Sequence, residues 1–235
     1  MKKILKFLKN TLCILLLVGI VFSLITLSKG YDMYKDAIAK VSIEEKVKSI
    51  KAEENYLSIK DIPKDFVNAV VSIEDKRFYT HSGIDIISLG RAIITNFEDM
   101  KLTEGGSTIT QQLAKNMYFT QEKKVTRKIA EVFVASNLEK KYSKDEIFEL
   151  YANVIYFGDG YYGIKEASNG YFLKEPIELT LDQITILAGI PNAPSVYALS
   201  INPELAKKRQ SLVIDAMYEN KYLDVTQVDS LKNDL

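Results

Sequence analysis

From residue 63 onward, apolar residues recur at the three- and four-residue spacing of helices. The first such run, which places Phe66 and Val70 on one face, ends at Glu74 and Asp75. The predicted helices cover residues 63–74, 86–97, 126–142, 144–154, 181–189 and 203–217. Alternation typical of a strand is confined to Val154–Phe157. The pattern predicts a mainly helical single domain.

The expected helix starts carry recognisable signals. Ser143 and Glu146 form a capping-box pattern, as do Thr180 and Gln183. Prolines stand at the first positions of the helices beginning near residues 63 and 203, where a missing N–H costs nothing.

The N-terminus is strongly apolar. Thr11–Ser28 carries no charge and, as a helix of roughly 18 residues, reaches ~27 Å, close to the hydrocarbon thickness of a bilayer. Basic residues precede it, and no small-x-small cleavage site follows, which favours a retained anchor over a signal peptide. The basic flank predicts a cytoplasmic N-terminus and an extracytoplasmic domain at the cytoplasmic membrane. The predicted organisation is a tail over residues 1–10, an anchor over 11–28, a solvated helix or stalk over 29–57 and a domain over 58–235.

The composition excludes little. The 31 basic and 31 acidic residues balance, which gives no general support for nucleic-acid binding. Cys13 is the only cysteine, so an internal disulfide is excluded.

The stretch Gly105–Asn116, GGSTITQQLAKN, is unusually rich in hydroxyl and amide groups. Glycines let a backbone approach a ligand closely, and the polar side chains could line a cleft. The alternative is a plain helix start, with Ser107 as the cap of a polar surface helix.

Glu74 and Glu131 are the candidate carboxylates. Glu74 follows an apolar helix, and partial burial disfavours the charged form of a carboxylate, as a general base needs. The alternative is a local ion pair with Lys76 or Arg77. Glu131 lies four residues after Arg127, so it is either a second site carboxylate or half of a weak intrahelical pair. The single histidine, His81, is expected to be structural.

Basic residues gather around these acids in an otherwise neutral chain. If Lys115, Lys123, Lys124, Arg127 and Lys128 face one cleft, they suit a phosphate or diphosphate. A carboxylate base together with cations for a phosphorylated leaving group is what glycosyl transfer from a sugar diphosphate requires. The membrane anchor suggests that this diphosphate is attached to a lipid.

The ordered motifs resemble the peptidoglycan glycosyltransferase family, and specifically its monofunctional, membrane-anchored members. The resemblance covers about residues 59–222. The matching positions are Glu74, Asp75, Phe78, His81 and Gly83, then Gly106–Gln112 with Lys115 and Asn116, then Arg127, Lys128 and Glu131, then Lys144, Ile147, Glu149, Tyr151 and Asn153, and more loosely Arg209, Val213 and Met217.

The resemblance implies a lysozyme-like, mainly α fold with a large and a small lobe, and polymerisation of lipid II into β-1,4-linked glycan strands with release of undecaprenyl pyrophosphate. Glu74 would be the base on the acceptor 4-hydroxyl, and Glu131 would assist on the donor side. The implied substrate-binding residues are Lys115, Lys123 and Arg127 at the phosphates, Ser107, Thr108, Gln111, Gln112 and Asn116 along the cleft, and Asn153 behind it.

The sequence departs from the family at several positions. Lys123 and Lys124 replace a frequent Arg-Ser pair, Gln210 stands where a second arginine is common, and Leu173 replaces a frequent glycine. Lysine keeps the charge but loses the bidentate fork of arginine. The chain ends at Leu235, so no transpeptidase domain of the bifunctional relatives is expected within it.

The resemblance also implies a divalent metal, Mg²⁺ or Mn²⁺, at the donor diphosphate, although no metal-ligand cluster is legible in the sequence. No organic cofactor is expected. The expected partners are lipid II, the nascent glycan strand, the membrane and a separate transpeptidase.

Two other functional classes stay open. Two acids in a helical fold also suit a glycan-cleaving hydrolase or lytic transglycosylase, and an anchored protein could be a non-catalytic cell-wall scaffold. A looser hypothesis places Leu102, Met117, Tyr118 and Phe119 in the membrane around the cleft, the alternative being that they belong to the core.

Overall fold

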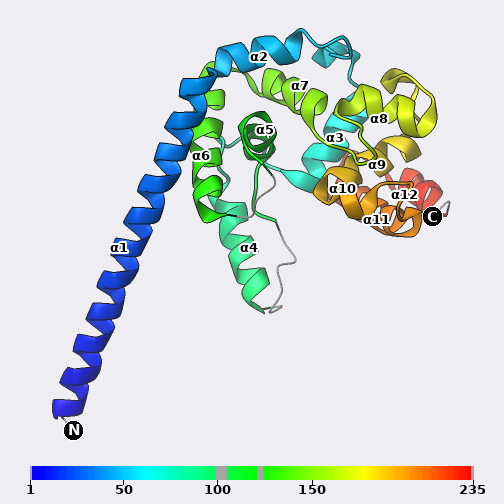
Figure 1. Cartoon of the computed structure of the whole chain (residues 1–235). Helices are drawn as coiled ribbons and strands as arrows, with labels where there is room; N and C mark the ends of the chain where they lie inside the picture. The colour runs from blue at the N-terminus through cyan, green and yellow to red at the C-terminus, as the bar shows by residue number, and fades with distance from the viewer. Residues whose placement is uncertain (1, 99–104, 121–123, 234–235) are drawn as a thin grey trace.

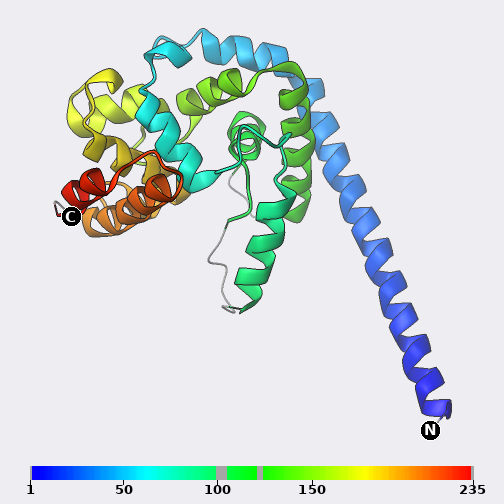
Figure 2. The same cartoon turned by 180° about the vertical axis from the view of Figure 1, so that it is seen from behind.

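The computed structural model describes residues 2–98, 105–120 and 124–233, and it is almost entirely helical (Figures 1 and 2). Within these residues the only β pairing is an isolated bridge between Tyr156 and Tyr162. The helices are α1 (Lys2–Lys40), α2 (Ile43–Lys51), η1 (Ile59–Asp61), α3 (Lys64–Glu74), α4 (Ile86–Glu98), α5 (Ile109–Tyr118), α6 (Val125–Lys141), α7 (Lys144–Val154), α8 (Gly163–Phe172), η2 (Pro176–Glu178), α9 (Leu181–Gly189), η3 (Ile190–Asn192), α10 (Pro194–Tyr197), α11 (Pro203–Glu219) and α12 (Val225–Asn233). The mainly α fold expected from the sequence is confirmed.

The first half of α1 projects away from the rest of the molecule (Figure 1). Its large apolar side chains are exposed. It is the one helix of the described part of the chain that is long and apolar enough to cross a membrane, and none of its most apolar window is buried. Together with the relatives reported below, this supports a membrane-anchored protein.

The region predicted as a solvated stalk differs from that expectation. Helix α1 continues without a break to Lys40 and lies along α6, and the side chains of Ile43 and Val47 in α2 are buried. Tyr31 and Tyr34 stack with Phe133 of α6, with ring centroids 5.1 and 5.6 Å apart. The segment is dominated by Lys and Glu, so its narrow apolar face was not recognised in the sequence. A few apolar residues are enough to dock this face on the domain.

The domain has two groups of helices, joined along one side by α2 and α7 (Figures 1 and 2). Helices α5 and α6 pack on each other and on α7, while α3, α9 and α11 pack together in the second group. A continuous core connects them, with Phe66, Phe78, Phe148 and Phe157 fully buried at its centre. This arrangement places the end of α3 opposite the starts of α4 and α5.

The predicted helix starts are confirmed at three positions. Ser143 and Thr180 form complete capping boxes with Glu146 and Gln183. The Asn202 side chain accepts a hydrogen bond from the N–H of Leu205, 3.1 Å away. Each side chain satisfies an N–H that the first turn of a helix leaves unpaired.

Candidate active site

A cleft of about 410 Å³ lies between the two helix groups. The residues that line it come from the end of α3, the start of α4, the segment before α5, the exposed faces of α5 and α6, η3 and α11: Ser72, Ile73, Glu74, Asp75, Lys76, Asp85, Ser88, Arg91, Gly105, Gly106, Ser107, Thr108, Gln112, Lys115, Lys128, Pro191, Asn192 and Arg209. Glu74 and Lys115, predicted at the site from the sequence, therefore share one cavity.

Glu74 is held by groups from distant parts of the chain. Its Oε1 accepts a hydrogen bond from Arg209 Nη2 at 3.0 Å, and its Oε2 accepts one from Gln112 Nε2 at 2.8 Å. Its side chain is 8% exposed. Glu74 therefore pairs with Arg209 and not with its sequence neighbours Lys76 or Arg77. Arg77 donates instead to Asp85 at 2.7 Å. Glu74 is thus fixed in orientation while still lining the cleft.

Asp75 ties the end of α3 to the start of α5. Its carboxylate accepts hydrogen bonds from His81 Nε2 at 2.9 Å and from the N–H of Ile109 at 3.0 Å. The structural role expected for His81 agrees with this contact. Because α5 starts at Ile109, the bond also sets where Gln112, one turn later, meets Glu74.

The segment before α5 is both a helix start and a cleft wall. Thr108, rather than Ser107, is the cap, and it forms a capping box with Gln111. Thr108 also donates to the carbonyl of Gly83 at 2.7 Å. Ser107 instead accepts a hydrogen bond from Lys128 Nζ at 2.6 Å in the cleft. Thr108 therefore fits the interpretation as a helix start, whereas Ser107 fits the interpretation as a cleft residue.

Some of the predicted cleft residues do not line the cavity. Gln111 is buried by its capping contact, and Asn116 donates to the carbonyl of Gln112 at 2.8 Å. The Asn153 amide pairs with both the N–H and the carbonyl of Leu57 at 2.8 Å. Lys123 lies outside the described residues. These assignments of substrate-binding residues stay predictions.

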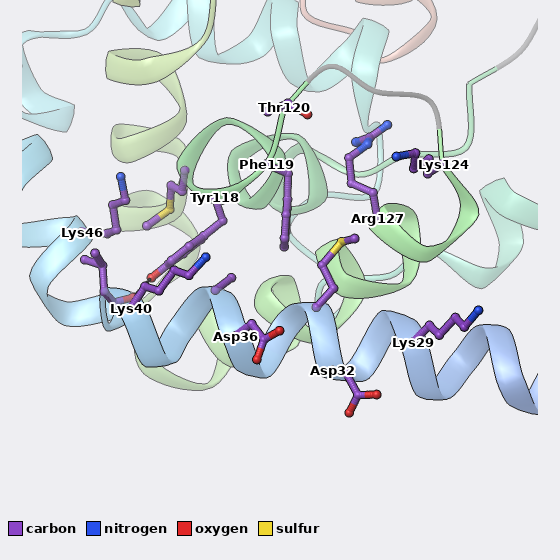
Figure 3. Close-up of a pocket in the computed structure, with 14 residues that line it drawn as sticks. Lys29, Asp32, Asp36, Lys40, Lys46, Tyr118, Phe119, Thr120, Lys124 and Arg127 are labelled. Atoms are coloured by element: carbon purple, nitrogen blue, oxygen red, sulfur yellow. Dashed lines mark hydrogen bonds between the residues drawn. The ribbon is translucent and has the colours of Figure 1, made fainter.

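Glu131 is fully buried and paired with two cations. Its carboxylate accepts hydrogen bonds from Arg127 and, at 3.0 Å, from Lys128 Nζ. Of these cations, Lys128 lines the cleft, whereas Arg127 lines a second cavity (Figure 3). Glu131 therefore reaches the cleft through Lys128, which the sequence analysis had grouped with the basic residues that could face one cleft.

The cleft cations share a crowded, partly dry environment. Burial, together with repulsion from Arg127, lowers the pKa of Lys115, although Glu74 acts in the opposite direction. Burial, followed by repulsion from Arg127 and Lys115, lowers the pKa of Lys128 to about 8. An anion entering the cleft would relieve this repulsion, which is how a diphosphate site is expected to behave.

Arg209 was the contact hardest to foresee. It lies 135 residues after Glu74 in the chain, and the only signal was its place in the loosest of the matching motifs. Its neighbour Gln210 is buried and donates to Asp182 and Thr185, so the departure from arginine there serves the packing of α11 on α9.

The described residues do not fit a metal held by protein ligands alone. No group of three His, Cys, Asp or Glu side chains among them could hold an ion. Glu74, Asp75, Asp85 and Glu131 already pair with Arg209, His81, Arg77 and the two cations of α6. The divalent metal stays a prediction, and no step below depends on it.

Comparisons with known proteins identify the family. The family described as Transglycosylase matches residues 42–218. Penicillin-binding protein 1F of Bacillus subtilis (strain 168) is 42% identical over 200 residues, which cover 85% of this chain and 27% of that protein. Penicillin-binding protein 1A of Neisseria cinerea is 44% identical over 179 residues, covering 76% and 22%.

The chain thus spans about a quarter of the length of these curated relatives. A crystal structure of penicillin-binding protein 1A from Haemophilus influenzae aligns over 75% of this chain and 17% of that one, with a TM-score of 0.44 and 20% identity. On the family match, which covers three quarters of its length, the chain belongs to the transglycosylase family, whose members include the glycosyltransferase domain of the class A penicillin-binding proteins.

Proposed function

We propose that this protein polymerises lipid II into β-1,4-linked glycan strands at the outer face of the cytoplasmic membrane. The observation that carries the proposal is the shared cleft, in which Glu74 is held by Arg209 and Gln112 while Lys115 and Lys128 line the same cavity. The family match supports glycosyl transfer, and the choice of lipid II as both donor and acceptor is our inference.

On the acceptor side, Glu74 takes the proton of the acceptor 4-hydroxyl as that oxygen attacks the donor's anomeric carbon. Arg209 and Gln112 hold the carboxylate in a fixed orientation before the reaction. A positioned general base of this kind contributes typically about 10²–10⁴-fold to the rate.

On the donor side, the bond between the anomeric carbon and the diphosphate oxygen breaks, and undecaprenyl pyrophosphate leaves. Lys115 and Lys128 supply positive charge where the negative charge develops. Glu131, buried beneath Lys128, holds that ammonium group in place and offsets part of its repulsion from Arg127.

The apolar half of α1 anchors this site at the membrane that contains both substrates. The lysines before residue 10 favour a cytoplasmic N-terminus, which would put the cleft outside the cytoplasm.

The test is polymerisation of labelled lipid II by detergent-solubilised full-length protein. We expect polymer from the wild type, a loss of about 10²-fold or more in Glu74→Gln, and a smaller loss in Glu131→Gln, which acts through Lys128. Lys208→Ala, on the exposed side of α11, is the control and should match the wild type. A well-folded wild type that forms no polymer, with or without Mg²⁺, would overturn the proposal.

Two results would favour the other classes. Soluble muropeptides released from sacculi would indicate a hydrolase or lytic transglycosylase, which has less use for two lysines in the cleft. Full complementation of a deletion strain by Glu74→Gln would indicate a scaffold.

A further inference from the structure

A largely buried ion pair outside the cleft has no part in the reaction described above. Lys144 Nζ, from the first residue of α7, lies 2.7 Å from Oε1 of Glu139 in the last turn of α6, and the two side chains are 19% and 8% exposed. Neither is one of the described residues that line the cleft. Lys144 is one of the positions that match the family, and it has so far had no role.

Local helix electrostatics do not explain where these two charges lie. The first turn of a helix carries a partial positive charge and its last turn a partial negative one. Lys144 is therefore a cation at a positive helix end, and Glu139 is an anion near a negative one. The reason for their positions must lie in the contacts that they make with each other and with other segments.

The pair connects the two segments that meet at the proposed catalytic base. Thr110 of α5, which is fully buried, donates from Oγ1 to the same Glu139 oxygen at 2.6 Å. Lys144 Nζ lies 4.5 Å from the ring centroid of Phe78, in the turn after α3, which is a cation–π distance. Gly83, in the segment after α3, packs so closely on α6 that an added Cβ would lie 3.2 Å from Glu139 Cγ. We call this set the α5 clamp: Phe78, Thr110, Glu139 and Lys144.

The start of α5 is attached in two directions. Thr108 Oγ1 donates to the carbonyl of Gly83 at 2.7 Å, and the N–H of Ile109 donates to Asp75 at 3.0 Å. Both bonds attach α5 to the segment after α3, whereas Thr110 attaches it to α6 and α7. Without the bond from Thr110, α5 could tilt about its attachment to the segment after α3.

We propose that Glu139 and Lys144 are positioning residues for glycosyl transfer, acting through Thr110. The α5 clamp holds the start of α5 in the place from which Gln112, two residues after Thr110, donates to Glu74 at 2.8 Å. A displacement of about 1 Å can cost about a hundredfold in rate. The inference rests on the proposed function, since Glu74 is the base in that reaction.

The test is steady-state polymerisation of lipid II by the full-length protein in detergent, with kcat and KM measured separately. Thr110→Val removes the hydroxyl that donates to Glu139 but keeps the shape of the side chain and the ion pair with Lys144. We expect kcat to fall about tenfold with less than about a twofold change in KM, because orienting the base affects the chemical step rather than substrate binding. Thr110→Ser keeps the hydroxyl and should recover kcat.

The ion pair itself has a matched control. Lys144→Met removes the cation, and kcat should fall at least about tenfold. Lys141→Met, three positions earlier in the chain, breaks the ion pair with Glu44 of α2 and removes the same charge. Its kcat should match that of the wild type. Should Lys144→Met fail to fold, Thr110→Val decides the question alone, because it leaves the ion pair intact.

A double-mutant cycle separates positioning from a general loss of structure. In a Gln112→Ala background, the group that the α5 clamp positions is absent, so Thr110→Val should lower kcat by less than about twofold. Its effect on the melting temperature should be the same in both backgrounds. A contact that only stabilised the fold would keep its whole effect on kcat in the Gln112→Ala background.

Three results would overturn the inference: a kcat of Thr110→Val equal to that of the wild type, a loss in Thr110→Ser as large as that in Thr110→Val, or an undiminished loss in the Gln112→Ala background. Hydrogen exchange of residues 109–118 needs no transfer reaction. It should be faster in Thr110→Val than in the wild type, and equal exchange would also overturn the inference. A wild type that formed no polymer would instead overturn the proposed function.

Discussion

At the scale of single residues, Arg209 determines how Glu74 is presented. Its Nη2 donates to one carboxylate oxygen at 3.0 Å while Gln112 occupies the other. In Arg209→Met the carboxylate keeps one partner and can rotate about its last bond. We expect kcat to fall by about a hundredfold with little change in KM, the size of effect that a displacement of about 1 Å can produce.

The measurement is steady-state polymerisation of lipid II with separate kcat and KM. Arg209→Lys is the informative comparison, because a lysine restores a single donor and should recover part of kcat. If Arg209→Met raised KM and left kcat unchanged, Arg209 would instead contact the substrate directly.

Lys128 predicts how the activity depends on pH. Its pKa is lowered to about 8, so the charged form that would contact the diphosphate is present below pH 8 and lost above it. We expect kcat/KM to decline as the pH rises through about 8. In Lys128→Arg the decline should move to higher pH, since a guanidinium stays protonated.

The pH dependence of the melting temperature distinguishes this loss of activity from unfolding. A lysine whose folded pKa lies below its unfolded value binds fewer protons in the folded state between the two pKa values, so its own contribution to stability rises with pH there. Activity should therefore fall while the melting temperature does not fall on account of Lys128. A parallel decline of both would contradict the assignment.

The residue scale is also where sequence reasoning fell short. Glu74, Asp75 and Lys115 were singled out because their motifs are compact, and the structure brings them to one cavity. The partners of Glu74 were not foreseen, because the pairing with Arg209 spans 135 residues and depends on how α11 packs on α3. Likewise, spacing alone could not indicate that Arg127 and Lys128, adjacent in α6, line different cavities.

At the scale of helices, the apolar periodicity and the caps located six helices within two residues at either end: α3, α4, α6, α7, α9 and α11. The sequence analysis did not predict α8, α10 or α12. It also missed the packing of the segment after the anchor, where Lys and Glu dominate and only a few apolar residues dock on α6 and α7. Met117 follows the alternative given for it, since its side chain is buried in the core, whereas Leu102 lies outside the described residues.

The end of α8 shows a conformational cost at a position where the sequence departs from the family. Leu173, which replaces a frequent glycine, adopts φ 54° and ψ 39° and is 90% exposed. A side chain in this left-handed region costs roughly 1–2 kcal/mol, while glycine loses about 0.5–1 kcal/mol in additional chain entropy. Leu173→Gly should therefore raise the free energy of unfolding by roughly 0.5–1 kcal/mol, as no buried contact is lost.

Thermal unfolding of the full chain in detergent would measure this gain. Leu173→Ala is the control, because it keeps a Cβ in the same backbone conformation and should show no comparable increase. If Leu173→Ala stabilised the protein as much as Leu173→Gly, the exposed side chain rather than the backbone would be the source of the cost.

At the scale of the whole molecule, the packing of α1 on α6 connects the anchor to the catalytic domain. The contact depends on Gly30, where an added Cβ would lie 2.5 Å from Cγ2 and 2.6 Å from Cβ of Ile129. Isoleucine is branched at Cβ and has few rotamers to escape into. An alanine at position 30 would therefore push α1 and α6 apart.

Gly30→Ala should lower the thermal stability of the full-length protein even though alanine favours helix formation by about 1 kcal/mol, because overpacking costs typically about 1–3 kcal/mol. Gly19→Ala is the matched control, since nothing lies within 4 Å of a Cβ at position 19 of the same helix. Gly19→Ala should leave the melting temperature unchanged or slightly higher. If the anchor orients the cleft toward the membrane, Gly30→Ala should also lose more activity on lipid II in vesicles than on a short-chain analogue in detergent. Equal losses on both substrates would mean that α1 stabilises the domain without orienting it.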